Sequence, residues 1–252
     1  MKTRYLRTTD IAKAVGVHAN TVRLYEQWGF LPPIPRSPAG YRRYTQEHLA
    51  QMQLARLALH GGWPGHAVRV SAAALVRRAA SGDLGGALAQ AYDHLARVQA
   101  ERAQAEAAAD FLEKWAQGMM PQPTSRPLPI KDVAALLDVS ADALRNWERN
   151  GLIEVPRDPH NGYRRYGAAE IGRLRVIRML GRAGYGQMAI LRMLLKLDAG
   201  HTTALREALD APDPDESITY TSDQWLSTLA EHEARARQMI AHLEEMIRAR
   251  RG

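Results

Sequence analysis

The sequence predicts a mainly α-helical protein made of two successive copies of one domain, each followed by a long amphipathic helix of coiled-coil type. Three observations support this prediction. The sequence Gly-Tyr-Arg-Arg-Tyr occurs at residues 40–44 and again at residues 162–166, an offset of 122 positions. Apolar residues recur at spacings of three and four, the period of an α-helix. Two segments, 84–112 and 225–246, carry apolar residues at heptad spacing.

The repeat extends on both sides of the five-residue match. The same offset pairs identical residues without a gap: Asp10 with Asp132, Ala12 with Ala134, Val17 with Val139, Arg23 with Arg145, Glu26 with Glu148 and Gly29 with Gly151. Agreement in a single register indicates the duplication of a unit of about 65 residues, the size of a domain rather than of a short solenoid repeat.

Each copy predicts two short helices, a hairpin and a third helix. In the first copy, one short helix begins near Thr9 and the other covers residues 19–28. In the second copy, the two short helices cover residues 131–138 and 141–150. Each pair ends at a glycine, as helices commonly do. The proline-rich turn and the Gly-Tyr-Arg-Arg-Tyr run favour a small β-hairpin. A helix-turn-helix with such a hairpin is a winged helix.

The long segments follow the two copies. The first heptad seam is interrupted by Arg102 and the second by His232. Four prolines between residues 119 and 129 disfavour a helix and favour an extended spacer. We therefore expect winged-helix domains at 1–80 and 130–210, long helices at 81–118 and 218–252, and a linker at 119–129.

Composition indicates a soluble, cytoplasmic protein, and the distribution of charge bears on its partners. The sequence has no cysteine, which excludes disulfides and thiolate chemistry, and it shows neither an apolar signal core nor a transmembrane run. The net charge is +7, with nine Lys/Arg against three Asp/Glu in residues 1–65 and thirteen against eight in residues 126–200. Residues 82–117 are acidic, with three against six. Basic segments favour nucleic acid or an anionic membrane, although a solvated surface is the alternative.

The sequence predicts neither an enzyme nor a metal or cofactor site. No Ser/His/Asp set, phosphate loop or dinucleotide fingerprint occurs. The histidines are scattered without ligand spacing, at positions 18, 48, 60, 66, 94, 160, 201, 232 and 242.

The first copy resembles the MerR family of transcription regulators. The resemblance rests on residues 21–31 (Thr-Val-Arg-Leu-Tyr-Glu-Gln-Trp-Gly-Phe-Leu), on Arg36, on the run at 40–44, and on Leu49 with the Gly-Trp-Pro break at 62–64. It covers residues 8–80 well and residues 130–200 moderately. It implies that the second helix of each copy enters the major groove of DNA while the wing reaches the backbone.

The resemblance also implies particular DNA contacts. Arg23 and Tyr25 are expected at phosphates or neighbouring base edges, and the side chains at the start of the second helix are best placed to read bases. For Tyr25 and Tyr41 the alternative is packing in the core, for Arg43 it is a solvated charge, and Glu26 is expected to orient an arginine. The predicted DNA-binding residues are His18, Asn20, Thr21, Arg23, Tyr25, Arg36, Arg42, Arg43, Tyr44, Ser140, Arg145, Trp147, Arg157, Arg164, Arg165 and Tyr166.

The second copy departs from the pattern. Trp147 replaces a tyrosine, and Asp142 would bring a negative charge to face phosphate. Arg157 lies one position earlier than Arg36 in the common register. Ser140 is a better cap for its helix than the first copy has. We expect the second copy to read a different sequence; a purely structural second copy is the alternative.

Members of the family work as homodimers whose long helices pair antiparallel. Since this chain holds both halves, the resemblance implies a single-chain pseudo-dimer on an imperfect inverted repeat, in which 84–112 pairs with 225–246. Its partners would be double-stranded DNA, RNA polymerase and a small-molecule effector that the sequence does not identify. A homodimer with exchanged helices and an architectural DNA-bending or recombination accessory protein remain alternatives. A further alternative is a small-molecule-binding protein whose pocket is lined by Trp63, Tyr92, Trp115, Tyr185 and Trp225.

Overall fold

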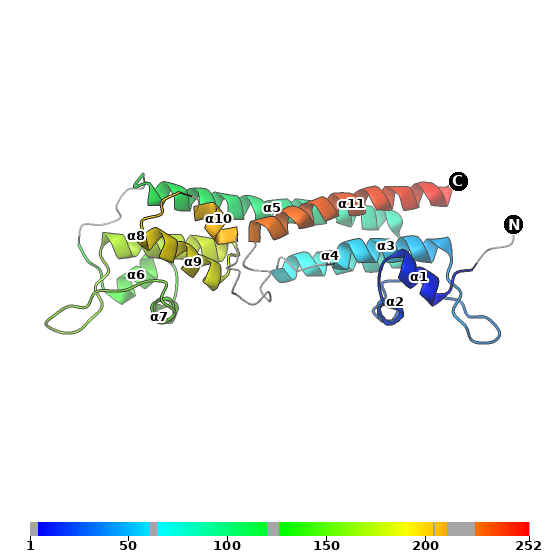
Figure 1. The fold of residues 1–252 in the computed structure, drawn as a ribbon, viewed down its shortest axis with the longest axis horizontal. Helices are drawn as coiled ribbons and strands as arrows, with labels where there is room; N and C mark the ends of the chain where they lie inside the picture. The colour runs from blue at the N-terminus through cyan, green and yellow to red at the C-terminus, as the bar shows by residue number, and fades with distance from the viewer. Residues whose placement is uncertain (1–4, 61–64, 120–125, 204, 211–224, 252) are drawn as a thin grey trace. The chain divides into compact units, whose positions relative to one another are not determined.

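The computed structural model describes residues 5–60, 65–119, 126–203, 205–210 and 225–251. Within these residues the chain forms eleven helices, α1 to α11, and no regular strand (Figure 1). The predicted mainly α-helical class is therefore confirmed. Trp63 and most of the linker predicted at 119–129 lie outside the described residues.

Two compact units divide the chain. Unit 1 contains residues 1–100 and 228–252, and unit 2 contains residues 101–227. The division falls inside both long helices, α5 (Leu84–Ala116) and α11 (Trp225–Arg251), which the heptad spacing predicted. Unit 1 therefore combines the first domain with most of α11, and unit 2 combines the second domain with the C-terminal half of α5.

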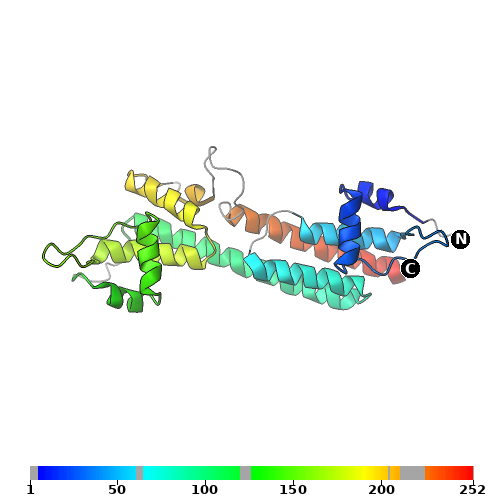
Figure 2. The same cartoon turned by 90° about the horizontal axis from the view of Figure 1, so that it is seen from below.

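Head 1, as we call residues 5–80, contains α1 (Thr8–Ala14), α2 (Ala19–Gln27), α3 (Gln46–Leu59) and α4 (Gly65–Ala80). Gly29 follows α2 with a φ of +72°, a backbone conformation that glycine adopts without strain at a helix C-terminus. Ile11, Val22 and Met52 are fully buried and join the first three helices in one core. Figure 2 shows that α2 crosses α3 and so presents one side to solvent.

Head 2, as we call residues 126–210, repeats this order with α6 (Ile130–Leu136), α7 (Ala141–Arg149), α8 (Ala168–Arg182) and α9 (Gln187–Asp198), followed by α10 (Leu205–Asp210). In Figure 2, α7 crosses α8 as α2 crosses α3. The core again joins the helices, since Val133, Leu144 and Leu174 are buried.

The expected β-hairpins are reduced to isolated antiparallel bridges in the described residues. They pair Leu6 with Tyr44, Arg36 with Arg42, Leu128 with Tyr166, and Arg157 with Arg164. Prolines explain the short pairing: positions 32, 33, 35 and 38 of the first wing and 156 and 159 of the second have no backbone N–H to donate.

Within unit 1, α11 runs antiparallel to the first half of α5. Gln99 Nε2 donates to Glu233 Oε1 at 3.0 Å, Tyr92 Oη donates to Glu244 Oε1 at 3.4 Å, and Arg250 Nη1 donates to the Gly82 carbonyl at 2.8 Å. The residue numbers rise on one helix as they fall on the other. The seam between them is lined by small and flexible side chains, including Ala87, Ala91, Ala236, Met239 and Leu243.

Each head also packs against the long helix that follows the other copy. In unit 1, His242 of α11 lies 2.8 Å through Nε2 from the Ala50 carbonyl of α3. In unit 2, Tyr185 Oη donates to the Ala105 carbonyl of α5 at 3.1 Å, and Arg206 pairs with Asp110. The two copies are therefore interleaved within each unit. No helix of the described part of the chain is long and apolar enough to cross a membrane.

Candidate nucleic-acid interface

The exposed start of α2 carries a set of polar side chains in head 1. His18 precedes the helix, and its Nδ1 accepts a hydrogen bond from the Asn20 backbone N–H at 3.3 Å. Arg23 Nη1 donates to Asn20 Oδ1 at 3.3 Å, one turn along the helix. Asn20 and Arg23 are exposed and Thr21 is half-buried, whereas Val22 anchors the opposite face in the core. The helix therefore presents donors and acceptors to solvent from a fixed base.

An ion pair fastens the wing of head 1 to this helix. Arg42 Nε donates to Glu26 Oε2 at 2.7 Å, and both side chains are about a quarter exposed. This contact through Nε fixes the orientation of the Arg42 guanidinium on the wing. Arg36 Nη1 donates to the Gly40 carbonyl at 3.3 Å. Arg43 lies over the ring of Tyr5, 5.0 Å from its centroid.

A hollow of about 750 Å³ lies on head 1 beside this helix and wing. Its lining combines Arg23 of α2 with Arg42, Arg43 and Tyr41 of the wing, and it is completed by Ser37 and residues 5–9. The hollow is rich in guanidinium, hydroxyl and backbone donors. Such a surface suits the phosphate oxygens of a nucleic-acid backbone.

Head 2 repeats the scaffold with altered charges. Ser140 caps α7 by accepting the Ala143 backbone N–H at 3.0 Å, as predicted from its position. Arg164 Nε donates to Glu148 Oε2 at 2.6 Å, the counterpart of the pair that holds the first wing. Arg157 Nη1 donates to the Gly162 carbonyl at 3.4 Å. Arg145 pairs with the carboxylate of Asp142, and Arg165 pairs with that of Asp158. Trp147 is half-buried.

Three tyrosines predicted to contact DNA are buried in the heads, so those predictions are corrected. Tyr25, Tyr44 and Tyr166 are 6%, 0% and 1% exposed. Tyr25 packs against Trp28 and Phe30, and the backbones of Tyr44 and Tyr166 form the bridges at the base of each wing. Burial raises the pKa of all three hydroxyls. These rings lie in the core because burying two apolar ring faces and one hydroxyl costs less free energy than burying a charged side chain.

Two other tyrosines take the exposed position instead. Tyr41 and Tyr163 are 75% and 74% exposed near the tips of the two wings. The packing alternative considered for Tyr41 is therefore wrong, and neither residue was among the predicted contacts. The signal was present in the repeated Gly-Tyr-Arg-Arg-Tyr run, since both tyrosines follow a glycine of positive φ at a turn.

Three of the aromatic residues of the alternative small-molecule pocket, Trp115, Tyr185 and Trp225, are engaged in packing. Tyr185 and Trp225 are buried, and the Trp225 indole N–H donates to the Ala183 carbonyl at 2.6 Å. Trp115 lies against Gly172, and Tyr92 is half-exposed on the first half of α5. These contacts are those of structural residues rather than of one shared cavity.

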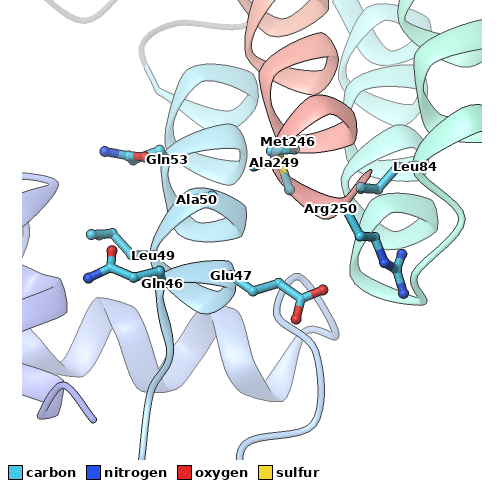
Figure 3. Close-up of a pocket in the computed structure, with 9 residues that line it drawn as sticks. All are labelled: Gln46, Glu47, Leu49, Ala50, Gln53, Leu84, Met246, Ala249 and Arg250. Carbon is cyan, nitrogen blue, oxygen red and sulfur yellow. The ribbon is translucent and has the colours of Figure 1, made fainter. Parts of the chain in front are cut away.

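A different hollow of about 490 Å³ lies within unit 1 (Figure 3). It is formed by the start of α3, the start of α5 and the end of α11, with an aliphatic floor and polar groups at the edge. Its lining residues are Gln46, Glu47, Leu49, Ala50, Gln53, Leu84, Met246, Ala249 and Arg250. Among the described residues, no group of three His, Asp or Glu side chains could hold a metal ion.

Comparison with known proteins decides the family. Residues 6–71 match the family model described as "MerR HTH family regulatory protein", and residues 129–166 match the model described as "MerR family regulatory protein". The chain contains two regulatory modules of the MerR type. Each match coincides with one helix-turn-helix and its wing, so the MerR module is present twice. Both models are described as those of regulatory proteins.

The MerR relatives resemble only part of the chain. The HTH-type transcriptional regulator CueR of Escherichia coli O6:H1 is 40% identical over 58 residues, which is 23% of this chain and 43% of the relative. A ZntR homolog of Haemophilus influenzae is 43% identical over 42 residues, covering 17% and 31%. CueR of Yersinia pestis is 33% identical over 58 residues, covering 23% and 42%. The chain thus spans less than half the length of these relatives, and no solved structure matches it.

Proposed function

We propose that this MerR-family chain is a transcription regulator that binds double-stranded DNA through both heads and acts in the bacterial cytoplasm. The observation that carries the proposal is the basic hollow of head 1. There Arg23 from α2 and Arg42 and Arg43 from the wing line one concave surface. The curated relatives are named as transcriptional regulators, which agrees with this role.

In this proposal α2 lies in the major groove and the wing follows the backbone. His18, Asn20 and Thr21 at the start of the helix read base edges, while the arginines and the exposed Tyr41 bind phosphates. The Glu26–Arg42 pair at 2.7 Å holds the wing in the orientation that permits both contacts. Head 2 supplies the second reading surface through α7 and through the wing around Arg157, Arg164 and Tyr163.

The antiparallel contacts of α5 and α11 support a single-chain pseudo-dimer. Gln99 with Glu233 and Tyr92 with Glu244 reproduce, inside one chain, a pairing that would otherwise need a second subunit. The preferred site would then be an imperfect inverted repeat, because the two reading helices differ in sequence. RNA polymerase and a small-molecule effector are the further partners that this role would involve.

Salt dependence of DNA binding tests the proposal. A duplex selected from a random pool would be labelled, and its affinity for the full chain measured by fluorescence anisotropy across a salt series. We expect log K to fall linearly with the logarithm of the salt concentration. The slope should be about −0.9 for each phosphate neutralised, which gives about −3 or steeper for one head. Failure to bind any duplex at low salt, or binding that salt does not weaken, would overturn the proposal.

A further inference from the structure

We propose that the two heads bind DNA unequally, because Asp142 and Asp158 pair with arginines of head 2 at places where head 1 has neutral side chains. Head 1 would then supply most of the affinity and head 2 a weaker, more selective contact. This inference rests on the proposed DNA binding, and it adds which head dominates and which two residues decide it.

The first difference lies on the reading helices. Asp142 occupies the position of Asn20 in the repeat, three residues before the shared arginine. In head 1, Arg23 Nη1 donates to the neutral Asn20 Oδ1 at 3.3 Å. In head 2, Arg145 Nη1 donates to the carboxylate Oδ1 of Asp142 at 2.6 Å. The geometry is conserved while one negative charge is added beside the arginine.

The second difference lies in the wings, and only the structure shows which residues correspond. The Ser37 backbone N–H donates to the Tyr41 carbonyl, and the Asp158 backbone N–H donates to the Tyr163 carbonyl, both at 2.8 Å. Asp158 is therefore the counterpart of Ser37, although the ungapped register of the sequence places it opposite Arg36. The wing of head 2 has one additional residue between the two bridge positions.

Asp158 engages the second arginine of head 2 closely. Its Oδ2 accepts from Arg165 Nη2 at 2.6 Å and from Arg165 Nε at 3.1 Å. The hydrogen bond from Arg165 and those from the His160 and Asn161 backbones hold the pKa of Asp158 below its usual value. The carboxylate is thus charged at neutral pH. In head 1 the corresponding Arg43 lies over the uncharged ring of Tyr5.

The Asp142–Arg145 pair contributes little to folding, because the two side chains are 88% and 48% exposed and such surface pairs stabilise a protein only slightly. The Asp158 side chain is only 11% exposed and also accepts from two backbone N–H groups, so Asp158 helps to hold the turn of the wing. The effect of the two carboxylates on a nearby phosphate is larger. A carboxylate already paired with the guanidinium competes with the phosphate for its N–H groups and repels the backbone charge.

The test removes the two charges without changing shape. The double variant Asp142→Asn/Asp158→Asn keeps the side-chain oxygens that accept from Arg145, His160 and Asn161. Affinity for the selected duplex is measured across the same salt series. We expect binding at least about five-fold tighter for each substitution and a salt slope steeper by about two, since two arginines become available to phosphates.

The matched control is the reverse change in head 1, Asn20→Asp/Ser37→Asp, which should weaken binding by a similar factor and flatten the slope. Circular dichroism melting of both variants checks that each remains folded. If the head 2 variant is folded and binds with the affinity and slope of the unaltered chain, the asymmetry proposal is wrong while the DNA-binding proposal stands. If the unaltered chain binds no duplex at low salt, both proposals fall.

Discussion

At the scale of single residues, the site depends on a charge pair that occurs once in each head. Glu26 holds Arg42 at 2.7 Å and Glu148 holds Arg164 at 2.6 Å. The sequence predicted that Glu26 orients an arginine. It did not identify which arginine, because the partners are sixteen residues apart and meet only when the wing folds back onto the helix.

Arg23 and Arg42 are expected to respond differently to substitution. Arg23→Ala removes an exposed side chain, so DNA affinity should fall by about 1–3 kcal/mol with the melting temperature unchanged. Arg42→Ala should weaken DNA binding similarly and also lower the free energy of unfolding by about 1 kcal/mol, since Glu26 loses its partner. Anisotropy titrations and thermal melts of both variants measure this. Unfolding of Arg23→Ala, or normal DNA binding by either variant, would contradict the assigned roles.

At the scale of elements, periodicity and glycine positions were sufficient for the helix-turn-helix of each copy. The observed α2 and α7 begin where predicted and end one residue earlier. The helices α4, α9 and α10 were not predicted, because the repeated motif ends before them. Burial separates the two tyrosines of each Gly-Tyr-Arg-Arg-Tyr run: the first is exposed and the second lies in the core. The two tyrosines are three residues apart, so an extended backbone directs them to opposite faces, but this spacing does not tell which face is buried.

Gly184 packs against the Trp225 indole within unit 2. It has a φ of +98°, and a Cβ at this position would lie 2.4 Å from the Trp225 ring. Gly184→Ala should therefore lower the free energy of unfolding by about 2 kcal/mol or more. Gly181→Ala is the matched control. Gly181 lies in α8, and a Cβ added there would have no neighbouring atom within 4 Å. This substitution should raise the free energy of unfolding by up to about 1 kcal/mol. Chemical denaturation measures both, and an unchanged Gly184→Ala variant would refute the tight packing of Trp225.

At the scale of the whole molecule, duplication gives one chain two helix-turn-helix modules and two long helices, on which the proposed pseudo-dimer rests. Heptad spacing predicted both long helices. The contacts of α11 with α5 and with head 1 could not be derived from heptad spacing, because an apolar seam does not determine which helix packs against it. In unit 1 these contacts run from Gln99 with Glu233 to His242 with the Ala50 carbonyl. The two copies differ at Asp142 and Asp158, which head 1 replaces by neutral side chains.

The mass of the protein–DNA complex tests this account most directly. Multi-angle light scattering would be applied to the full chain alone and to the chain bound to its selected duplex. We predict a free species near the chain mass of 28.1 kDa and a complex of one chain per duplex, with both half-sites protected in a footprint. A free dimer that places two chains and four heads on the duplex, or one chain that protects a single half-site, would contradict the single-chain pseudo-dimer.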